Sequence, residues 1–399
     1  MNWNDFKKQF ENELTDNILN YWVKEAYDTS RSTFFGRITN EGKKFPEAAL
    51  SAVLTTRILW TFSAAHRIYP TAIYKKMADE AFRILVETFW DNENGGIYWS
   101  VFPDGKPDDT KKQFYAEAFF IYAMSEYWLA FKSEKAKQLA VSMFMLMEKY
   151  AFDPEFGGYI EANTADWKET TDQRLSPKDL DVKKSMNTHL HILEAYTNLY
   201  RVHKVDEVEK KVEHLIRIFL DKILDEKTGH LILFFDKDWT VRSEIDSYGH
   251  DIEATWLMHE AAEVLGNKEI IEEVEKAAIK ISDVTIKEGL APNGGVYYEK
   301  AEGHIQEQFD WWPQAEAVVG FFNTYQITKD EKYLGYSQKS WKFIQDHIID
   351  KKNGEWFWGV GADLKPLKGD KVGPWKGPYH NGRMCMEMIR RIEIVMKQK

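Results

Sequence analysis

The sequence is 399 residues long, 44% hydrophobic and 29% charged, so it has enough apolar residues for a large core. Its net charge of -11 argues against nucleic acid or an anionic membrane as the main partner, and the lack of a long apolar segment predicts a cytoplasmic protein. The single cysteine, Cys385, excludes an intramolecular disulfide and a zinc site made of several thiolates.

The N-terminal residues predict an amphipathic helix, and the chain beyond it is organised by a recurring glycine turn. The intervals between successive turns are 59, 62, 72, 65 and 60 residues. A period of this kind indicates a sixfold internal repeat. The glycines from which the intervals are measured are Gly36, Gly95, Gly157, Gly229, Gly294 and Gly354.

Between the turns the apolar residues keep a helical period, with enough chain for two helices in each interval. The links inside a pair, such as residues 66–70 and 204–206, are short, whereas the glycine-containing links are long and carry alternating segments that suggest short hairpins. Long loops therefore collect at one end. We expect an all-α protein, a single-domain (α/α)6 barrel of twelve helices spanning residues 1–399, with short β-hairpin loops at its mouth. The longest loop, residues 161–184, is either a lid or a disordered excursion.

The residues that begin each helix after a long loop are mostly His, Arg, Tyr, Trp and Glu. These residue types are poor helix caps but suit binding and catalysis. Since all these helices begin at the same end, their side chains are expected to converge on one mouth. The candidates are Arg57, Tyr115, Asn187, His191, His250, Glu253, Trp311, Trp312, Glu316 and His380.

His250 falls in the first turn of its predicted helix, where unpaired N–H groups and the helix dipole favour the neutral imidazole. A neutral imidazole can act as a general base. Glu253 lies three residues later on the same face, where it can orient the imidazole or contact a substrate hydroxyl. The simpler alternative is a capping histidine beside a solvated glutamate.

His189 and His191 resemble a pair of metal ligands, but residues two apart face opposite sides of a helix, whereas zinc pairs on helices use i, i+4 spacing. We therefore expect no metal and no cofactor. His191 shares the register of Asn187 one turn earlier and is expected to face the mouth, with His189 packing outward.

Two reactions fit the predicted mouth. Glycoside hydrolysis needs two carboxylates, but it does not require three histidines and an arginine in the same place. Proton transfer next to a carbonyl does need such groups: a base, an electropositive group for the enediolate oxygen and, for inversion, an acid on the opposite face. The candidate carboxylates for hydrolysis are Glu253, Glu316, Asp251 and Glu161.

The chain resembles the cellobiose 2-epimerases of the N-acylglucosamine 2-epimerase superfamily over residues 10 to 394. The matching motifs are residues 186–200, 248–254, 311–316 and 375–383. The resemblance implies an (α/α)6 barrel that epimerises the reducing-end glucose of β-1,4-linked disaccharides at C2 without a cofactor, cellobiose to glucosyl-mannose and lactose to epilactose.

The resemblance also implies a role for each residue. His250 and His380 are the implied acid and base, and Arg57, Asn187, His191 and Glu253 bind or polarise the opened sugar. Trp312 and Trp375 stack on sugar rings, and Tyr115 lines the pocket. We further expect Arg57 and His191 to stabilise the enediolate oxygen. The first repeat departs from the pattern at residues 33–35, which are Thr-Phe-Phe in place of Gly-Gly-Phe, and at Thr55 in place of Asn.

Three alternatives stay open from the sequence. An aldose-ketose isomerase or an N-acylglucosamine 2-epimerase would use the same barrel. A non-catalytic sugar-binding protein would fit the tryptophan content but has no need of paired histidines.

Overall fold

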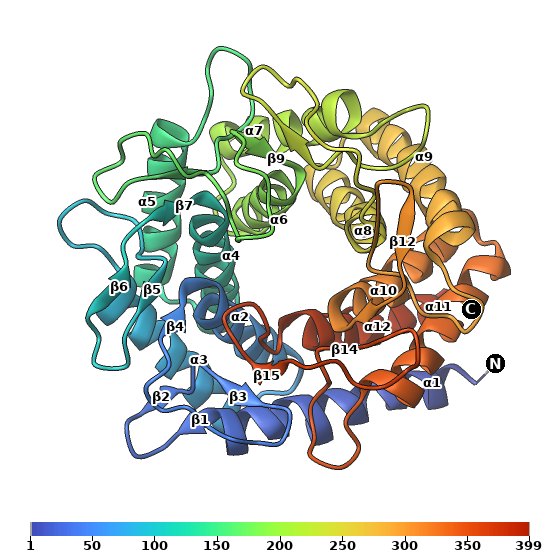
Figure 1. Ribbon diagram of the computed structural model, residues 1–399, viewed down its shortest axis with the longest axis horizontal. Helices are drawn as coiled ribbons and strands as arrows, with labels where there is room; N and C mark the ends of the chain where they lie inside the picture. Colours follow the sequence, from blue (N-terminus) through green and yellow to red (C-terminus); the bar gives the residue numbers. More distant parts are fainter. Residues whose placement is uncertain (1, 399) are drawn as a thin grey trace.

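The computed structural model describes residues 2–398, which contain twelve α-helices arranged as two concentric rings (Figure 1). This arrangement confirms the (α/α)6 barrel. The inner ring consists of α2 (Ala52–Ile68), α4 (Phe114–Phe131), α6 (Met186–Val202), α8 (Tyr248–Leu265), α10 (Trp311–Thr328) and α12 (Tyr379–Lys397). The outer ring consists of α1 (Trp3–Asn12), α3 (Ala72–Ile84), α5 (Glu134–Tyr150), α7 (Asp206–Ile218), α9 (Lys268–Val284) and α11 (Glu331–Phe343).

The two rings differ in how far their helices are buried. Inner helices are buried on nearly every side, as α4 is from Phe114 to Tyr127. Outer helices are amphipathic: α7 buries Val208, Val212 and Leu215 on one face and exposes charged residues on the other. Several outer helices end in a π-helical turn, namely Leu85–Phe89 after α3, Phe219–Ile223 after α7, Thr285–Gly289 after α9 and Ile344–Ile348 after α11.

The ring is closed by the two ends of the chain, because α1 packs beside α12. The predicted N-terminal amphipathic helix is confirmed, with Phe6 and Phe10 buried. The Phe10 ring lies 4.7 Å from that of Trp341 on α11. Two further π-helical segments, Glu13–Leu19 and Trp22–Ala26, continue this outer element. The N-terminal helix α1 therefore completes the outer ring.

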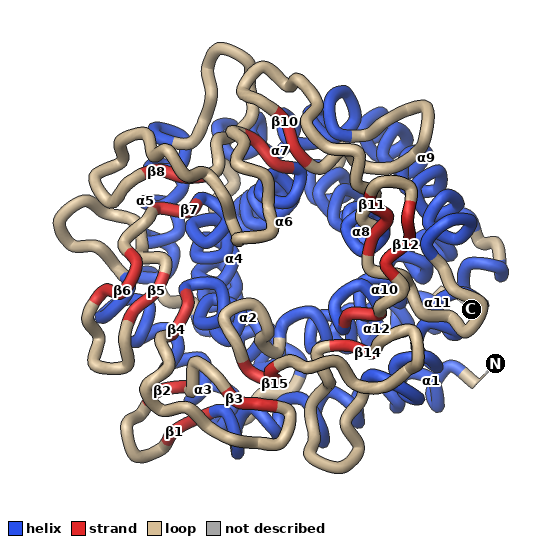
Figure 2. Tube along the Cα trace, in the orientation of Figure 1, coloured by secondary structure: helices blue, strands red, loops and turns tan. Residues whose placement is uncertain are grey.

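The long loops meet at one end of the barrel, where short strands join them into a second ring (Figure 2). Hairpins within one loop were predicted and three occur in the described chain: β1 (Tyr27–Asp28) with β2 (Thr33–Phe34), β5 (Ser100–Val101) with β6 (Pro107–Asp109), and β11 (Glu299–Ala301) with β12 (His304–Gln306).

The other strand pairs connect the loops of neighbouring repeats, which the sequence did not predict. They are β4 (Leu50–Ser51) with β5, β7 (Lys112–Gln113) with β8 (Ala162–Asn163), β9 (Lys184–Ser185) with β10 (Phe234–Phe235), β13 (Phe309–Asp310) with β14 (Gly359–Val360), and β15 (Asp370–Val372) with β3 (Ile38–Thr39). A bridge between Asp246 and Lys300 completes the circuit. The mouth is thus rimmed by backbone hydrogen bonds, which hold the start of each inner helix in place.

The fourth residue of four inner helices holds the glycine turn of the preceding loop. Glu117 accepts a hydrogen bond from the Ile97 N–H at 3.1 Å, and the Nε2 of His189 accepts one from Tyr159 at 2.9 Å. Asp251 and Gln314 accept the equivalent bonds from Leu231 and Val296. In the first repeat Thr55 differs, because its hydroxyl is donated to the Ser51 carbonyl of its own helix.

His189 and Asp251 are therefore loop supports. The expectation that His189 packs away from the mouth is confirmed. Asp251, a candidate for hydrolysis, is instead bonded to the Nδ1 of His230 at 2.7 Å. Among the helices in residues 2–398, none is both long and apolar enough to span a bilayer.

Candidate active site

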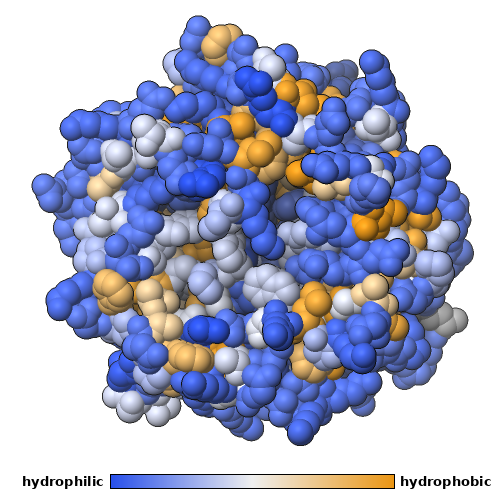
Figure 3. Space-filling model, in the orientation of Figure 1, coloured by the Kyte–Doolittle hydropathy of each residue, from blue (hydrophilic) through white to orange (hydrophobic). Residues whose placement is uncertain are grey.

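The centre of the loop-bearing face is hollowed, and its rim is mostly hydrophilic (Figure 3). The first two turns of the inner helices surround this hollow. Arg57 comes from α2, Tyr115 from α4, and His191 from α6. Glu253, Glu316 and His380 are contributed by α8, α10 and α12. The structure therefore brings together candidates that are more than 300 residues apart in the sequence.

Three histidines of the site share one geometry: the Nδ1 of each imidazole is bonded to a protein group. The partner is the Glu194 carboxylate for His191, at 2.9 Å, the Ser247 hydroxyl for His250, at 2.7 Å, and the Glu316 carboxylate for His380, at 2.7 Å. No described residue bonds to the Nε2 of any of the three. All three rings thus keep one nitrogen available for a ligand.

The partner of His250 corrects one expectation. Glu253 was a candidate to orient this imidazole, but its carboxylate is bonded to the Arg383 guanidinium at 2.6 Å. The side chain that does orient His250 is Ser247, the residue immediately before α8. The first-turn position of His250 is confirmed.

Burial favours the neutral form of all three imidazoles. It lowers the pKa of His250 to about 3, with the nearby His191 acting in the same direction. It also lowers the pKa of His380, where the cationic Arg57 and Arg383 add to the effect. The pKa of His191 is lowered by burial too, although the Glu194 carboxylate opposes the change. Neutral imidazoles are the form needed in a general base.

Arg383 is the charged centre beneath these histidines. Its Nη2 donates to Glu253 at 2.6 Å and to Glu316 at 2.8 Å, and its Nη1 donates to Glu194. All four side chains are only 1% exposed. One guanidinium therefore contacts three carboxylates that come from three different helices.

The three carboxylates titrate differently because they share this cation unequally. Burial and the neighbouring Glu316 raise the pKa of Glu253. Burial also raises the pKa of Glu316, although Arg383 opposes it. For Glu194, burial acts upward but is outweighed by Arg383 and the His191 contact, so its pKa falls to about 2. Glu194 is the carboxylate that stays ionised.

A second cation, Arg57, lies near the same Tyr379 ring as Arg383, at 5.0 Å against 4.3 Å from its centroid. Its Nη2 donates to the Tyr115 hydroxyl at 2.9 Å and its Nη1 to the Trp375 carbonyl at 2.6 Å. Two polar atoms in this region, Arg57 Nε and Asn187 Oδ1, are buried without a partner in the described chain. Leaving such atoms unpaired costs about 1–3 kcal/mol each, which is typical of a site prepared for a ligand or bound water.

Two tryptophans present partly exposed faces at the hollow. The Trp312 ring lies 4.6 Å from the His250 ring and 5.8 Å from the His380 ring, so it is close to both imidazoles. Trp375 lies edge-on to Tyr115 at 5.9 Å. Trp311 differs from both, because it is 3% exposed and packs against Trp358 at 4.4 Å.

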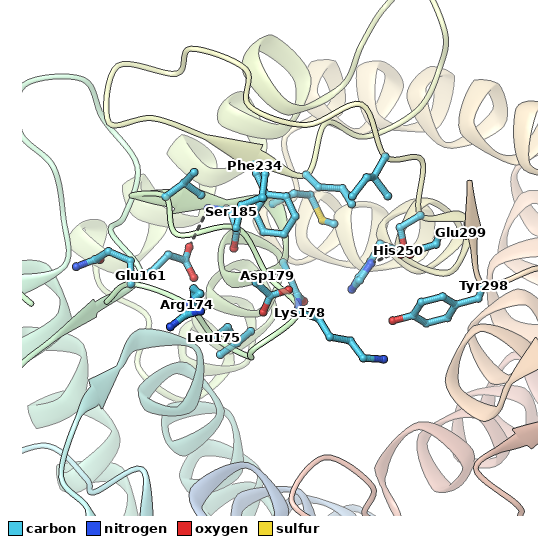
Figure 4. Close-up of a pocket in the computed structure, with 18 of the residues that line it drawn as sticks. Glu161, Arg174, Leu175, Lys178, Asp179, Ser185, Phe234, His250, Tyr298 and Glu299 are labelled. Atoms are coloured by element: carbon cyan, nitrogen blue, oxygen red, sulfur yellow. Dashed lines mark hydrogen bonds between the residues drawn. The ribbon is translucent and has the colours of Figure 1, made fainter. Parts of the chain in front are cut away.

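A pocket of about 310 Å³ opens beside His250 (Figure 4). The loop between residues 161 and 184 forms one side, with Lys178 and Asp179 across the pocket from His250 and Tyr298. Glu161 lies at the base of this loop, where it accepts hydrogen bonds from the Ser185 N–H and the Thr188 hydroxyl. The loop therefore lines the mouth.

Glu253, Glu316 and His380 also form a cluster whose ligand atoms are close enough to hold a metal ion. The Nη2 of Arg383 donates to both carboxylates of this cluster. A divalent ion at that point would lie against a permanent cation. The residues present do not favour a metal.

Arg383, Glu194 and Ser247 were missed by the sequence analysis. Both charged residues lie three positions after a candidate histidine, Glu194 after His191 and Arg383 after His380, which places each on the same helical face as that histidine. That spacing was an available signal. Ser247 precedes the predicted helix, and its position gave no comparable signal.

Comparisons with known proteins agree with this geometry. The family model for N-acylglucosamine 2-epimerase matches residues 33–382. Cellobiose 2-epimerase from Bacteroides fragilis is 47% identical, covering 96% of this chain and 98% of the relative, and the enzyme of that name from Dictyoglomus turgidum is 37% identical, covering 97% and 98%. The solved structure of cellobiose 2-epimerase from Bacillus thermoamylovorans B4167 superposes with a TM-score of 0.93 at 37% identity, covering 97% of this chain and all of that one.

Proposed function

The chain belongs to the N-acylglucosamine 2-epimerase family and is an isomerase, and we propose that it inverts C2 of the reducing-end glucose of β-1,4-linked disaccharides. Cellobiose and lactose are the expected substrates, giving glucosyl-mannose and epilactose, and no cofactor takes part. The substrate class is carried over from relatives that are named cellobiose 2-epimerases.

The observation that carries the mechanism is the pair of imidazoles close to Trp312. His250 is on α8 and His380 on α12, and each keeps an unbonded Nε2. In the proposed reaction the sugar ring opens and one imidazole, in its neutral form, removes the proton from C2 and becomes imidazolium. The resulting planar enediolate takes a proton on its opposite face from the other imidazole, which enters the reaction as imidazolium and leaves it neutral. Inversion at C2 follows because the proton leaves from one face and returns to the other.

The negative charge of the enediolate needs donors that are already in place. The guanidinium of Arg57 is one. The Tyr115 hydroxyl is a second, because it accepts from Arg57 and keeps its own proton for donation. Burial raises the pKa of Tyr115 far above neutrality, so the hydroxyl stays protonated. Donors fixed before the reaction stabilise developing charge without reorganisation.

The carboxylate pair supports His380. The Glu316 carboxylate is bonded to the Nδ1 of His380. Arg383 donates to both Glu316 and Glu253 and so holds these two carboxyl groups beside each other. Because burial raises the pKa of both carboxyl groups, this cluster holds a proton more readily than ordinary glutamates do. We assign it the task of keeping His380 oriented while its protonation changes.

The test is epimerisation of cellobiose in heavy water with identification of every product. The epimer should carry deuterium at C2, since the returning proton comes from an imidazole that exchanges with solvent. His250→Asn and His380→Asn should each reduce the rate by about 10²- to 10⁴-fold. Each variant should still exchange C2 hydrogen of one epimer only, glucose-type for one and mannose-type for the other.

His203→Asn is the matched control, because His203 lies at the far end of α6 and should leave the rate unchanged. Product without solvent hydrogen would indicate a hydride shift and contradict the mechanism. A ketose as the main product would instead show an aldose-ketose isomerase. Exchange of both epimers by both variants would contradict the assignment of the two histidines to opposite faces.

A further inference from the structure

We infer that Glu194 is a positioning residue that fixes the proton of His191 on Nδ1, so that Nε2 faces the sugar as a permanent hydrogen-bond acceptor. This inference deepens the proposed function and rests on it, because the sugar is the group that Nε2 would meet. It also revises the expectation that His191 donates to the enediolate oxygen. An imidazole nitrogen without a proton cannot donate.

The Glu194 carboxylate can only accept hydrogen bonds. Its Oε2 lies 2.9 Å from the Nδ1 of His191, while its Oε1 receives the hydroxyl of Tyr379 and the Nη1 of Arg383. An arginine is always protonated, and the Tyr379 hydroxyl accepts from Arg383 and therefore donates its own proton to Glu194, so Oε1 carries no proton and Oε2 is left to face Nδ1. The pKa of Glu194, lowered to about 2 against the effect of burial, agrees with that geometry.

The His191 imidazole is in its neutral form. It is 3% exposed and enclosed by the rings of Tyr115 and Phe119, each 4.8 Å away. Burial in these surroundings lowers the pKa of the imidazole. A neutral imidazole carries one proton, and an ionised carboxylate at Nδ1 requires that proton to be there. Nε2 is therefore left with a lone pair.

The other two site histidines have different partners at Nδ1. His250 faces the Ser247 hydroxyl, which can either donate or accept, so both tautomers of the ring satisfy the contact. His380 faces Glu316, whose carboxyl group also accepts from the Trp256 Nε1 at 3.0 Å and the Arg383 Nη2 at 2.8 Å and whose pKa is raised by burial. Both rings can take up or release a proton at Nε2, as an acid and base must.

The consequence is a division of roles. A hydroxyl group of the reacting sugar donates to the Nε2 of His191, which orients the substrate. Arg57 and Tyr115 are then the donors to the enediolate oxygen, since both present protons and lie next to the His191 ring. Proton transfer at carbon is left to His250 and His380, as in the proposed function.

The experiment is ¹⁵N NMR of the histidine side chains in the intact wild-type enzyme, with the His191 signals identified by their absence from His191→Asn. Protonated and unprotonated ring nitrogens have well-separated shifts. We expect a protonated Nδ1 and an unprotonated Nε2 at neutral pH. This measurement needs no activity, so it is independent of the proposed reaction.

Variants then test whether Glu194 is the cause. Glu194→Gln should give a mixture of tautomers, because an amide can accept or donate, and should lower kcat/KM by about 10- to 100-fold, mainly through KM. Glu194→Asp keeps the charge and should retain the wild-type tautomer. Glu148→Gln is the control: Glu148 also accepts two tyrosine hydroxyls and a lysine, but it lies on α5 away from the mouth, so neither shifts nor kinetics should change.

A proton on Nε2 of wild-type His191 would overturn the inference at once, even if Glu194→Gln failed to fold. An unchanged tautomer in Glu194→Gln would show that Glu194 serves only to pack or to neutralise Arg383. If the tautomers are as expected but the enzyme leaves cellobiose unchanged, the proposed substrate is wrong. The assignment of the His191 proton to Nδ1 would still stand.

Discussion

Replacing Arg383 by methionine should destabilise the protein strongly and by an amount that depends on pH. The change removes the only guanidinium that contacts Glu194, Glu253 and Glu316 together in the described chain. Methionine fills much of the same volume, so the main effect is the loss of charge rather than a cavity. Three buried carboxylates are then left without their cation.

The size of the effect follows from burial. Removing one partner of a buried ion pair costs about 3–5 kcal/mol, because the remaining charge is uncompensated. With an unfolding entropy of about 2.1 cal/mol/K per residue, a chain of this length gains or loses about 1 °C of Tm for each ~0.8 kcal/mol. We therefore expect thermal unfolding to shift down by about 4–6 °C. Arg390→Met is the control, since Arg390 is half exposed in its pair with Glu387 and should cost about 1 kcal/mol at most.

The pH dependence gives the sharper test. In the wild type the folded pKa of Glu194 is about 2, below its ordinary value, so this contact contributes stability above the unfolded pKa and loses it as pH falls. Without Arg383, burial and mutual repulsion raise the folded pKa values, and the carboxylates then destabilise the fold as pH rises. The loss of stability of Arg383→Met relative to the wild type should be larger at pH 8 than at pH 5. An equal deficit at both pH values, or a Tm within 1 °C of the wild type, would refute the reasoning.

Trp312→Ala and Trp375→Ala should impair disaccharides more than glucose, because stacking on the outer ring is lost. Equal losses in kcat/KM on both substrates would show that these rings contact only the reacting sugar or serve as core. Exhaustive chelation should leave the rate unchanged, since Arg383 already bonds to both carboxylates of the Glu253, Glu316 and His380 cluster. A loss of activity that added metal restores would contradict this expectation.

The barrel could be predicted because the glycine turns repeat and the apolar period between them is helical. What the repeat could not give was the partner of each short strand. Segments such as residues 100–101 were expected to pair within their own loop, but β5 pairs on one side with β6 and on the other with β4 from the preceding repeat. Strand pairing between loops depends on how the ring closes in three dimensions, which two- or three-residue segments do not encode locally.

The candidate site was predictable as a set of positions and less so as a set of contacts. Helix starts identified His191, His250, Glu253, Glu316 and His380 correctly as neighbours of one hollow. Their hydrogen-bond partners were not predictable, because each depends on side-chain direction. The carboxylate of Glu253 turns to Arg383 on another helix although His250 is its helical neighbour. A buried cation with three carboxylates is a stronger partner than a neutral imidazole.

That choice of partners gives each of the three imidazoles different proton chemistry. The Nδ1 of His191 is bonded to an ionised carboxylate, that of His250 to a hydroxyl, and that of His380 to a carboxyl group of raised pKa. Inversion at carbon needs two groups that can hold opposite protonation states and exchange them, and a neutral hydroxyl or a carboxyl that can itself be protonated allows such a change. The ionised carboxylate of Glu194 holds the ring proton of His191 on Nδ1, so the neutral ring can only accept a hydrogen bond at Nε2 and is suited to bind a sugar hydroxyl. The chemical difference between these histidines therefore arises from the groups bonded to Nδ1, on the side of each ring that a substrate does not reach.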